Sequence, residues 1–288
     1  MRVPLVWKSL GGRRPSDVRQ ANFRPVLLAA LNTQFYGRLL ESAGLGTPEE
    51  IAALDSMEEA LARLPRAEPG MVRMESRAML NPSAPGAGSQ DLFWPLPPAA
   101  RTAVLAAGFR WRPGLKTFRR ATHSRLASFR PEALAGPVSE LHRLADRIVD
   151  RWGAMPPLRH SVIAFVILRQ AFLSDEAREM FWRVFRVPVF GQIFGPSGEL
   201  LAWECEAHEG YHIEEGRSVM EIDANGGDPE LLVTSLTGLR RPAIRLATGL
   251  TGSIEHSACG CGIKGPRLVG LRRRSVVKPA VAAACAAR

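Results

Sequence analysis

The chain has few cysteines, few lysines and no long apolar run, and each shortage excludes a class of protein. Four cysteines among 288 residues are too few for the disulfide framework of a secreted protein. The apolar runs fall far short of the roughly 20 residues that span a bilayer, and the N-terminal stretch is too short for a signal peptide. We therefore expect a cytoplasmic protein with no membrane-spanning segment, whose thiols stay reduced.

Lysine occurs at only four positions, so the basic residues are mostly arginines that recur along the whole chain. A net charge of +10 favours nucleic-acid binding only where the cations gather on one face. The denser clusters are Arg119-Arg120 and Arg272-Arg273-Arg274, and a solvated surface explains them better than phosphate binding. Nucleic-acid binding is therefore the remote alternative.

Periodic apolar residues predict helices near the start of the chain. Residues 22–43 carry apolar side chains at helical spacing, and Gly44 follows as a C-terminal signal, which predicts one helix of about five turns. The pair Thr47-Pro48 opens a second helix, and Ser56 caps a third over residues 57–64.

The core of the chain changes from helical patterns to strand patterns. Residues 98–107 and 137–152 have helical spacing. A β-branched run at 161–168, a helix capped by Ser174 and an apolar run at 187–190 then predict a βαβ unit. Short strands and turns follow Gly195, and we expect them at 200–205, 217–223, 230–236 and 243–247, with a turn at Gly226-Gly227.

These patterns predict a mixed fold, α/β with α+β character, in four parts. They are a helical N-terminal segment, a flexible loop or linker rich in Pro, Gly and Ser, a core with a reduced α/β unit and a β-rich second half, and a basic tail. The respective boundaries are 1–68, 69–98, 99–270 and 271–288.

Three of the four cysteines and two histidines have the types and spacing of a zinc site. Cys205 is followed by His208 and His212, and Cys259 and Cys261 flank one glycine. The Cys-Gly-Cys turn places two sulfurs on one side, and three thiolates with one imidazole close a tetrahedral structural site. Either histidine can supply the fourth ligand. Buried cysteines without metal are the alternative, but the paired spacing favours a zinc that staples the β-rich half.

A series of motifs runs in a fixed order through the second half. They are Phe194-Gly195-Pro196-Ser197-Gly198-Glu199, Ala202 to Cys205 with Gly210 to Ile213, Met220-Glu221-Ile222, Glu230 to Leu236, Pro242 to Arg245 with Thr248-Gly249, and Cys259 to Gly262 with Pro266-Arg267-Leu268. With this order the chain resembles the phenylacetate-CoA ligase branch of the adenylate-forming, AMP-binding superfamily. The resemblance implies a structural zinc on the cysteine segments and places His212, rather than His208, at the fourth ligand.

The resemblance also implies ATP-dependent activation of a carboxylate, and several parts for that chemistry are missing. The family holds ATP phosphates with a hydroxyl-rich loop, which is not recognisable here. Leu250 stands where the family has the aspartate that binds ribose, and a leucine side chain accepts no hydrogen bond. Glu199 lies one residue after the position at which the family has the glutamate that binds Mg²⁺. Lys278 is the only lysine in the tail, where the family has a lysine-bearing domain.

Four residues remain as candidates for the nucleotide chemistry. Glu199 and Arg245 are the candidate catalytic residues, and Ser197 and Thr248 are the candidate cofactor contacts. A retained arginine can equally be packed by its stem or paired with a carboxylate such as Glu221.

We therefore expect a degenerate ligase relative, a pseudoenzyme that acts as a scaffold or binding protein with a structural zinc and takes a protein partner or a small carboxylate. The missing parts act as a unit in catalysis, which favours this interpretation over an enzyme. One alternative is a divergent ligase that forms acyl-adenylates and acyl-CoA with ATP, Mg²⁺ and CoA, completed by a partner chain. The remote alternative is the basic nucleic-acid-binding protein.

Overall fold

The computed structural model describes residues 15–68, 77–84, 92–110, 112–119, 122–152, 157–224 and 229–274. The helices are α1 (Pro15–Leu31), α2 (Gln34–Ser42), α3 (Pro48–Ala52), α4 (Met57–Arg63), the short η3 (Arg77–Met79), α5 (His123–Phe129), α6 (Val138–Arg147) with its continuation η4 (Ile148–Trp152), and α7 (Asp175–Phe185). The strands are β1 (Thr102–Val104), β2 (Leu115–Thr117), β3 (Ala133–Pro137), β4 (Val162–Ile167), β5 (Val189–Phe194), β6 (Leu200–Glu204), β7 (Tyr211–Ile213), β8 (Ser218–Asp223), β9 (Glu230–Ser235), β10 (Leu246–Ala247), β11 (Leu250–Glu255) and β12 (Arg267–Arg273).

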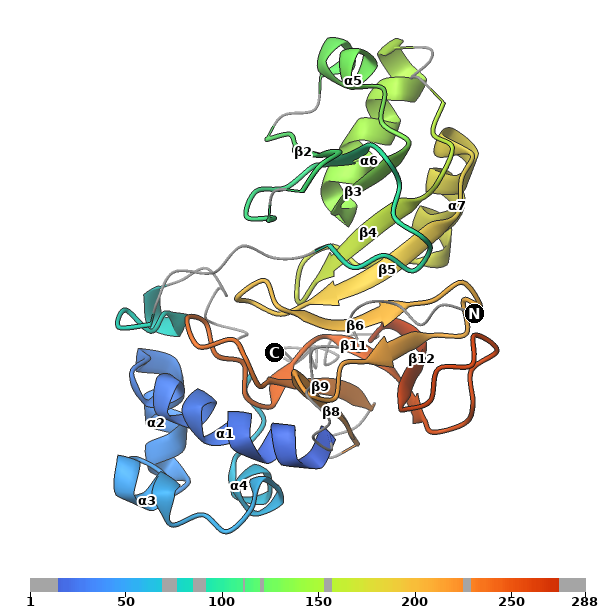
Figure 1. Ribbon diagram of the computed structural model, residues 1–288. Coiled ribbons are helices and arrows are strands. Elements are labelled where there is room, and N and C mark those ends of the chain that lie inside the picture. Colours follow the sequence, from blue (N-terminus) through green and yellow to red (C-terminus); the bar gives the residue numbers. More distant parts are fainter. Residues whose placement is uncertain are drawn as a thin grey trace, which may run out of the picture.

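A nine-stranded sheet with the order β11-β12-β7-β6-β5-β4-β3-β1-β2 forms the centre of the fold. In this spatial order, β2, β1, β3, β4 and β5 pair in parallel. From β5 onward, β6, β7, β12 and β11 each pair with the preceding strand in antiparallel direction. Helices α5 to α7 accompany the parallel part at one end of the molecule, and α1 to α4 lie at the other end (Figure 1). The predicted mixed α/β fold is confirmed.

The predicted βαβ unit is also confirmed. The β-branched run forms β4, which is buried along nearly its whole length, and Ser174 caps α7 by accepting from the Ala177 N–H at 3.2 Å. α7 leads into β5, which pairs with β4 in parallel. This unit places the carboxyl ends of both strands at the same edge of the sheet.

Two predictions of helices are wrong. The expected single helix over 22–43 is broken into α1 and α2, because the Thr33 hydroxyl accepts from the Tyr36 N–H at 3.0 Å and starts a new helix. The apolar spacing continues across the break because Tyr36 also faces the core. Residues 98–107 contain strand β1 instead of a helix, since pairing between β2 and β3 outweighs the weak local preference of a short apolar run.

The β-rich second half forms as expected, with differences in detail. β8 and β9 pair along six residues, and β10 extends them to a three-stranded sheet, although it is shorter than the predicted 243–247. The turn expected at Gly226-Gly227 lies outside the described residues. The patterns did not indicate β7, β11 and β12, which extend the large sheet.

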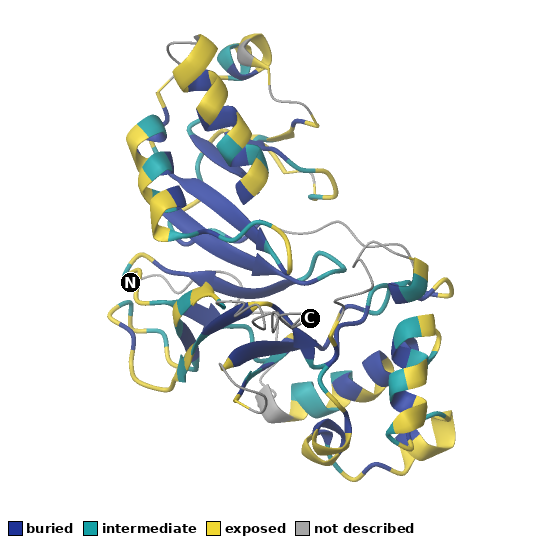
Figure 2. Ribbon diagram, turned by 180° about the vertical axis from the view of Figure 1, so that it is seen from behind, coloured by how far each residue is buried: buried dark blue, intermediate teal, exposed yellow. Residues whose placement is uncertain are grey.

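The N-terminal helices pack on the three-stranded sheet. Their apolar faces share one core with Leu236 and Ile244, and the Tyr36 hydroxyl accepts from the Ile244 N–H at 3.2 Å. Burial raises the pKa of Tyr36 well above its usual range. A second tie is the ion pair between Arg66 and Glu230 at 2.5 Å. Figure 2 shows that the central strands, β4 to β6 among them, are buried while the outer faces of the helices are exposed.

The part of the chain that the structure describes contains no helix long and apolar enough to cross a membrane. The division into four parts stays a prediction, and much of 69–98 and 271–288 lies outside the described residues.

We expect Phe181→Ala to lower the free energy of unfolding by about 3–5 kcal/mol, because Phe181 is fully buried in the core under α7. The neighbouring Trp182 is 53% exposed, so Trp182→Ala is the matched control and should cost below about 1 kcal/mol. Urea unfolding of both variants measures the difference; equal losses would contradict the assigned packing face of α7.

Candidate functional site

Three segments of the β-rich half bring one cluster of metal-ligand types together. Cys205 follows the end of β6, His212 is the middle residue of β7, and Cys259 and Cys261 lie in the loop between β11 and β12. One ligand atom from each of these four residues lies within 4.8 Å of the others. Cys261 is partly exposed and the other three are buried. The cluster therefore combines residues about fifty positions apart in the chain.

The distances in this cluster fit a tetrahedral zinc site. Zn–S bonds of about 2.3 Å and a Zn–N bond of about 2.0 Å would place two sulfurs about 3.8 Å apart and a sulfur and a nitrogen about 3.5 Å apart. Cys205 Sγ and Cys259 Sγ are 3.6 Å apart, and Cys261 Sγ is 3.4 Å from His212 Nε2. A disulfide would require sulfurs about 2.05 Å apart, so the cysteines are free thiols.

Protonation is part of the chemistry of this cluster. Burial raises the pKa of the Cys205 thiol to about 12 and also raises the pKa of Cys261. Burial, and then the charge of Arg267, lowers the pKa of His212, which keeps the imidazole neutral and able to bind metal. A metal would have to displace the thiol protons, so metal binding should weaken as the pH falls.

His208, the alternative fourth ligand, does not lie in the cluster. Its backbone has φ = 53°, in a turn, and its ring stacks on Phe190 with centroids 4.7 Å apart. The His212 ring stacks on Trp203 with centroids 4.9 Å apart. The structure thus brings His212 to the three sulfurs and turns His208 to another partner; that the four residues bind metal stays a prediction.

The candidate cofactor contacts are engaged inside the protein. The Ser197 hydroxyl donates to the Arg241 carbonyl at 3.3 Å and accepts from the Arg241 N–H at 2.9 Å. The Thr248 hydroxyl donates to the Leu231 carbonyl at 2.8 Å and accepts from the Leu250 N–H at 3.2 Å. Both hydroxyls are therefore hydrogen-bonded to the backbone of the protein itself.

Arg245, a candidate catalytic residue, is also held by the protein. Its guanidinium donates to the Leu64 carbonyl at 2.5 Å and pairs with Glu221 at 3.4 Å, the carboxylate that the sequence suggested. Burial raises the pKa of Glu221, and the neighbouring Arg245 opposes this effect. Arg245 thus fastens the N-terminal helical segment to β8.

Glu199, the other candidate catalytic residue, is a buried carboxyl group. Its two oxygens are inaccessible to solvent and lack hydrogen-bond partners of good geometry among the described residues. The oxygens lie so close to Gly195 and Gly238 that a Cβ at either glycine would overlap them. Burial raises the pKa of Glu199 to about 7, and the nearby Ser235 hydroxyl offsets this only in part.

A small crevice lies at the carboxyl ends of the parallel strands. Open α/β sheets bind ligands at this edge. The crevice has a volume of about 250 Å³, and three aromatic rings line it: Phe109 stacks on Phe165 with centroids 5.1 Å apart, and Phe165 meets Phe194 edge to face at 5.0 Å. Gly195 and Arg241 form part of its rim. The sequence did not indicate these aromatic residues as a site, although Phe165 lies in the predicted strand at 161–168 and Phe194 begins the first of the ordered motifs.

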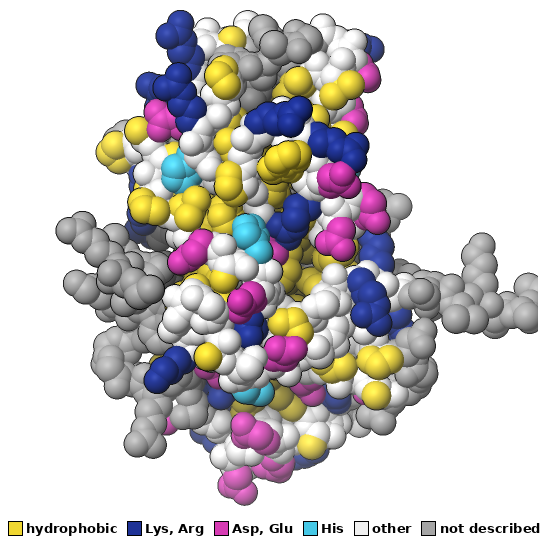
Figure 3. All heavy atoms as spheres, turned by 90° about the vertical axis from the view of Figure 1, so that its right-hand side faces the viewer, with side chains coloured by type: hydrophobic (Ala, Val, Ile, Leu, Met, Phe, Trp, Pro, Cys, Tyr) yellow, Lys and Arg dark blue, Asp and Glu magenta, His cyan; other side chains and the backbone are white. Residues whose placement is uncertain are grey.

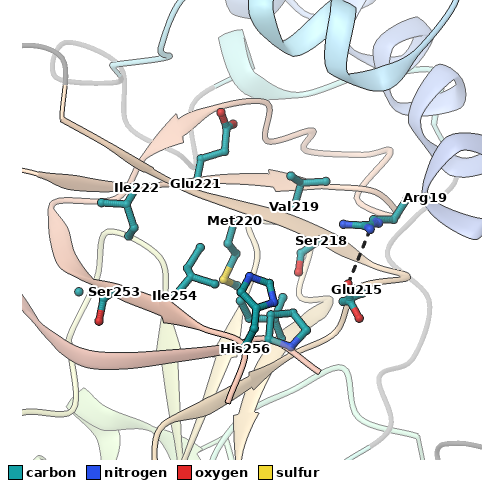
Figure 4. A pocket seen from close by; sticks show the side chains of 13 residues that line it. Arg19, Glu215, Ser218, Val219, Met220, Glu221, Ile222, Ser253, Ile254 and His256 are labelled. Atoms are coloured by element: carbon teal, nitrogen blue, oxygen red, sulfur yellow. Dashed lines mark ion pairs between the residues drawn. The ribbon is translucent and has the colours of Figure 1, made fainter. Parts of the chain in front are cut away.

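A larger groove of about 650 Å³ lies between β8 and β11, away from the nucleotide candidates Ser197, Glu199 and Thr248. Figure 4 shows Met220, Ile222 and Ile254 along it and the ion pair of Arg19 with Glu215, at 3.7 Å, across one end. Its size exceeds that of the crevice, but it contains neither the metal cluster nor the carboxyl ends of the parallel strands. The crevice is therefore the better candidate ligand site.

Comparison with known proteins defines the class of fold. No family model and no curated protein matches the sequence. Solved structures do match, among them structures of 2-hydroxyisobutyryl-CoA ligase. The structure has the fold of this ligase, and the phenylacetate-CoA ligase branch stays a prediction.

Two of the similar structures are states of one enzyme. An open conformation of 2-hydroxyisobutyryl-CoA ligase in complex with 2-HIB-AMP and CoA has a TM-score of 0.61 at 17% identity, covering 88% of this chain and 68% of that chain. The postadenylation state with 2-HIB-AMP also has a TM-score of 0.61, at 16% identity, covering 92% and 67%. A benzoate-CoA ligase from Burkholderia xenovorans LB400 overlaps less, with a TM-score of 0.35 at 13% identity over 51% and 34%.

The raised pKa of Glu199 makes the stability depend on pH. The unfolded carboxyl ionises near 4.5 and the folded one near 7, so the wild type should lose stability as the pH rises through this window. Glu199→Gln removes the titration, and we expect the variant to gain about 2–4 kcal/mol relative to the wild type between about pH 4.5 and pH 8. Urea unfolding at both pH values measures the gain. Glu58→Gln, at an exposed position, is the control. If the free energy of unfolding changed with pH equally in Glu199→Gln and the wild type, the raised pKa of the buried carboxyl would be contradicted.

Proposed function

We propose that this protein is a non-catalytic relative of the phenylacetate-CoA ligase branch, with a structural zinc and a small apolar ligand site. The ordered motifs of the sequence support the branch. One observation supports the loss of catalysis: the retained polar side chains donate hydrogen bonds to backbone carbonyls of the protein. These side chains are Ser197, Thr248 and Arg245.

The ribose position supports the same conclusion. Leu250 is 5% exposed and begins β11, so the residue at the place of the family's aspartate packs in the core. The adjacent Gly249 N–H donates to the Glu230 carboxylate at 2.7 Å, and Glu230 is itself bound by Arg66 and Arg274. The carboxylate next to the Thr-Gly turn therefore serves a buried ion-pair network and is not available to a nucleotide.

The zinc would have a structural role. Cys205, His212, Cys259 and Cys261 would supply four ligands, which leaves no open position for substrate or water. When bound, zinc would contribute folding free energy by cross-linking β6 and β7 to the β11–β12 loop. These residues hold the loop in place and take no part in group transfer.

The aromatic crevice suggests the kind of ligand. Phe109, Phe165 and Phe194 offer ring faces and edges to an apolar group, and the small volume limits its size. A small carboxylate with an apolar body fits this lining, with its charge toward the rim. A protein partner and a cytoplasmic location stay predictions.

A divergent ligase completed by a partner chain is the second candidate. The observation in its favour is the position of the crevice, beside the Gly195 turn at the carboxyl ends of the parallel strands. For the nucleic-acid alternative, Figure 3 shows Lys and Arg side chains interspersed with Asp and Glu on one face, without a continuous basic stripe. That surface gives little support to phosphate-backbone binding.

We expect about one zinc per purified chain, measured by elemental analysis. Cys259→Ser and Cys261→Ser should each lose the metal and destabilise the β-rich half, because structural zinc contributes directly to folding. Cys285→Ser removes the remaining cysteine as the control and should keep the metal. Folded wild-type protein that never contains metal would disprove the zinc site.

We expect no ATP–pyrophosphate exchange with a panel of aryl and short aliphatic carboxylates. The reason is that the ribose carboxylate is replaced by Leu250 and the retained hydroxyls are engaged internally. An active 2-hydroxyisobutyryl-CoA ligase run in parallel checks the assay. Exchange that depends on both ATP and one of the acids would establish the ligase instead.

A further inference from the structure

Arg267 occupies a central place under the candidate metal cluster. It begins β12, where it lies opposite His212 of β7 on one side and Glu255 of β11 on the other. Its side chain is only 4% exposed. A guanidinium is costly to bury without partners, so its contacts indicate what it does.

The Arg267 guanidinium binds both loops that carry the cysteines. Toward the β6–β7 loop it donates to the Glu209 carbonyl at 2.6 Å and lies 3.3 Å from the Glu209 carboxylate. Toward the β11–β12 loop it donates to the Ser257 hydroxyl at 2.9 Å and the Ala258 carbonyl at 3.5 Å. The rigid fork of donors thus spans the two loops.

Glu209 makes a second connection between the same loops. Its carboxylate accepts from the Gly260 N–H at 2.9 Å, and Gly260 is the residue between the two cysteines. A Cβ at Gly260 would come within 2.9 Å of the Glu209 carboxylate, so the glycine allows this close approach. The carboxylate therefore joins Arg267 to the backbone of the Cys-Gly-Cys turn.

We propose that Arg267 and Glu209 form a clamp that positions the two ligand-bearing loops and slows the loss of zinc. This inference rests on the zinc site proposed above. Release of the metal requires the Cys-Gly-Cys turn to move away from Cys205 and His212, and the clamp resists that movement with contacts that do not involve the metal. Zinc is a dication and three thiolates carry three negative charges, so the nearby guanidinium also balances the residual charge of the occupied site.

The test measures the rate at which the full-length, zinc-loaded protein gives up its metal to a chromogenic chelator. We expect Arg267→Met to release zinc about 10- to 100-fold faster than the wild type, by analogy with the range by which losing an outer-shell partner lowers metal affinity. Arg267→Lys keeps the charge without the fork and should restore part of the difference. Glu209 is 48% exposed, so Glu209→Ala should fold even if Arg267→Met does not, and it should also release zinc faster.

Arg245→Met is the matched control. Arg245 is also bound to a carbonyl and a carboxylate, with its side chain 17% exposed, but its partners, Leu64 and Glu221, lie in other parts of the protein. This variant should lose thermal stability and still release zinc at the wild-type rate. The Co²⁺-substituted proteins should keep the thiolate charge-transfer band in all variants, since the ligands are unchanged.

Wild-type release rates in folded Arg267→Met or Glu209→Ala protein would overturn the clamp and leave the zinc site intact. Equal acceleration in Arg245→Met would also overturn it, because general destabilisation would then explain the loss. A wild-type protein that binds neither Zn²⁺ nor Co²⁺ would overturn the metal site itself, and the clamp with it.

Discussion

The pairing of β12 between β7 and β11 is the constraint on which the second half depends. This pairing sets Arg267 opposite His212 and folds the β11–β12 loop over the end of β6. The four candidate ligand residues come together only in this register, because a shift of one residue would turn alternate side chains to the other face. The sheet therefore determines the geometry of the cluster, and a metal would reinforce contacts that the strands already impose.

The fold was predictable where local chemistry decides it. Thr47, Ser56 and Ser174 cap their helices as their sequence contexts indicated, because a cap needs only a hydroxyl and a nearby N–H. β3 was not predictable, since its alanines, Gly136 and Pro137 have low strand preference. Gly136 is required there because a Cβ would approach Leu105 within 2.8 Å, which is a tertiary constraint that no local pattern contains.

The candidate site was also predictable only in part from the sequence. The types and spacing of Cys205, Cys259 and Cys261 were visible in the sequence, because metal ligands come from a short list of side chains. The choice between histidines rested on a family resemblance, and the structure separates them by the positive φ of His208. The inward engagement of Ser197 and the burial of Glu199 depend on segments far apart in the chain, so residue types alone could not indicate them.

The buried carboxylate of Glu230 ties together segments that leave the ribosome at very different times. It binds Arg66, which is made early, and Arg274, at the end of the last described segment. The N-terminal helices can form as soon as they emerge, but their attachment through Arg66 has to wait until Glu230 of β9 has been synthesised, and the ion pair of Glu230 with Arg274 until the chain has passed β12. During that interval the helices can pack only on one another, without Leu236 and Ile244, which complete their core.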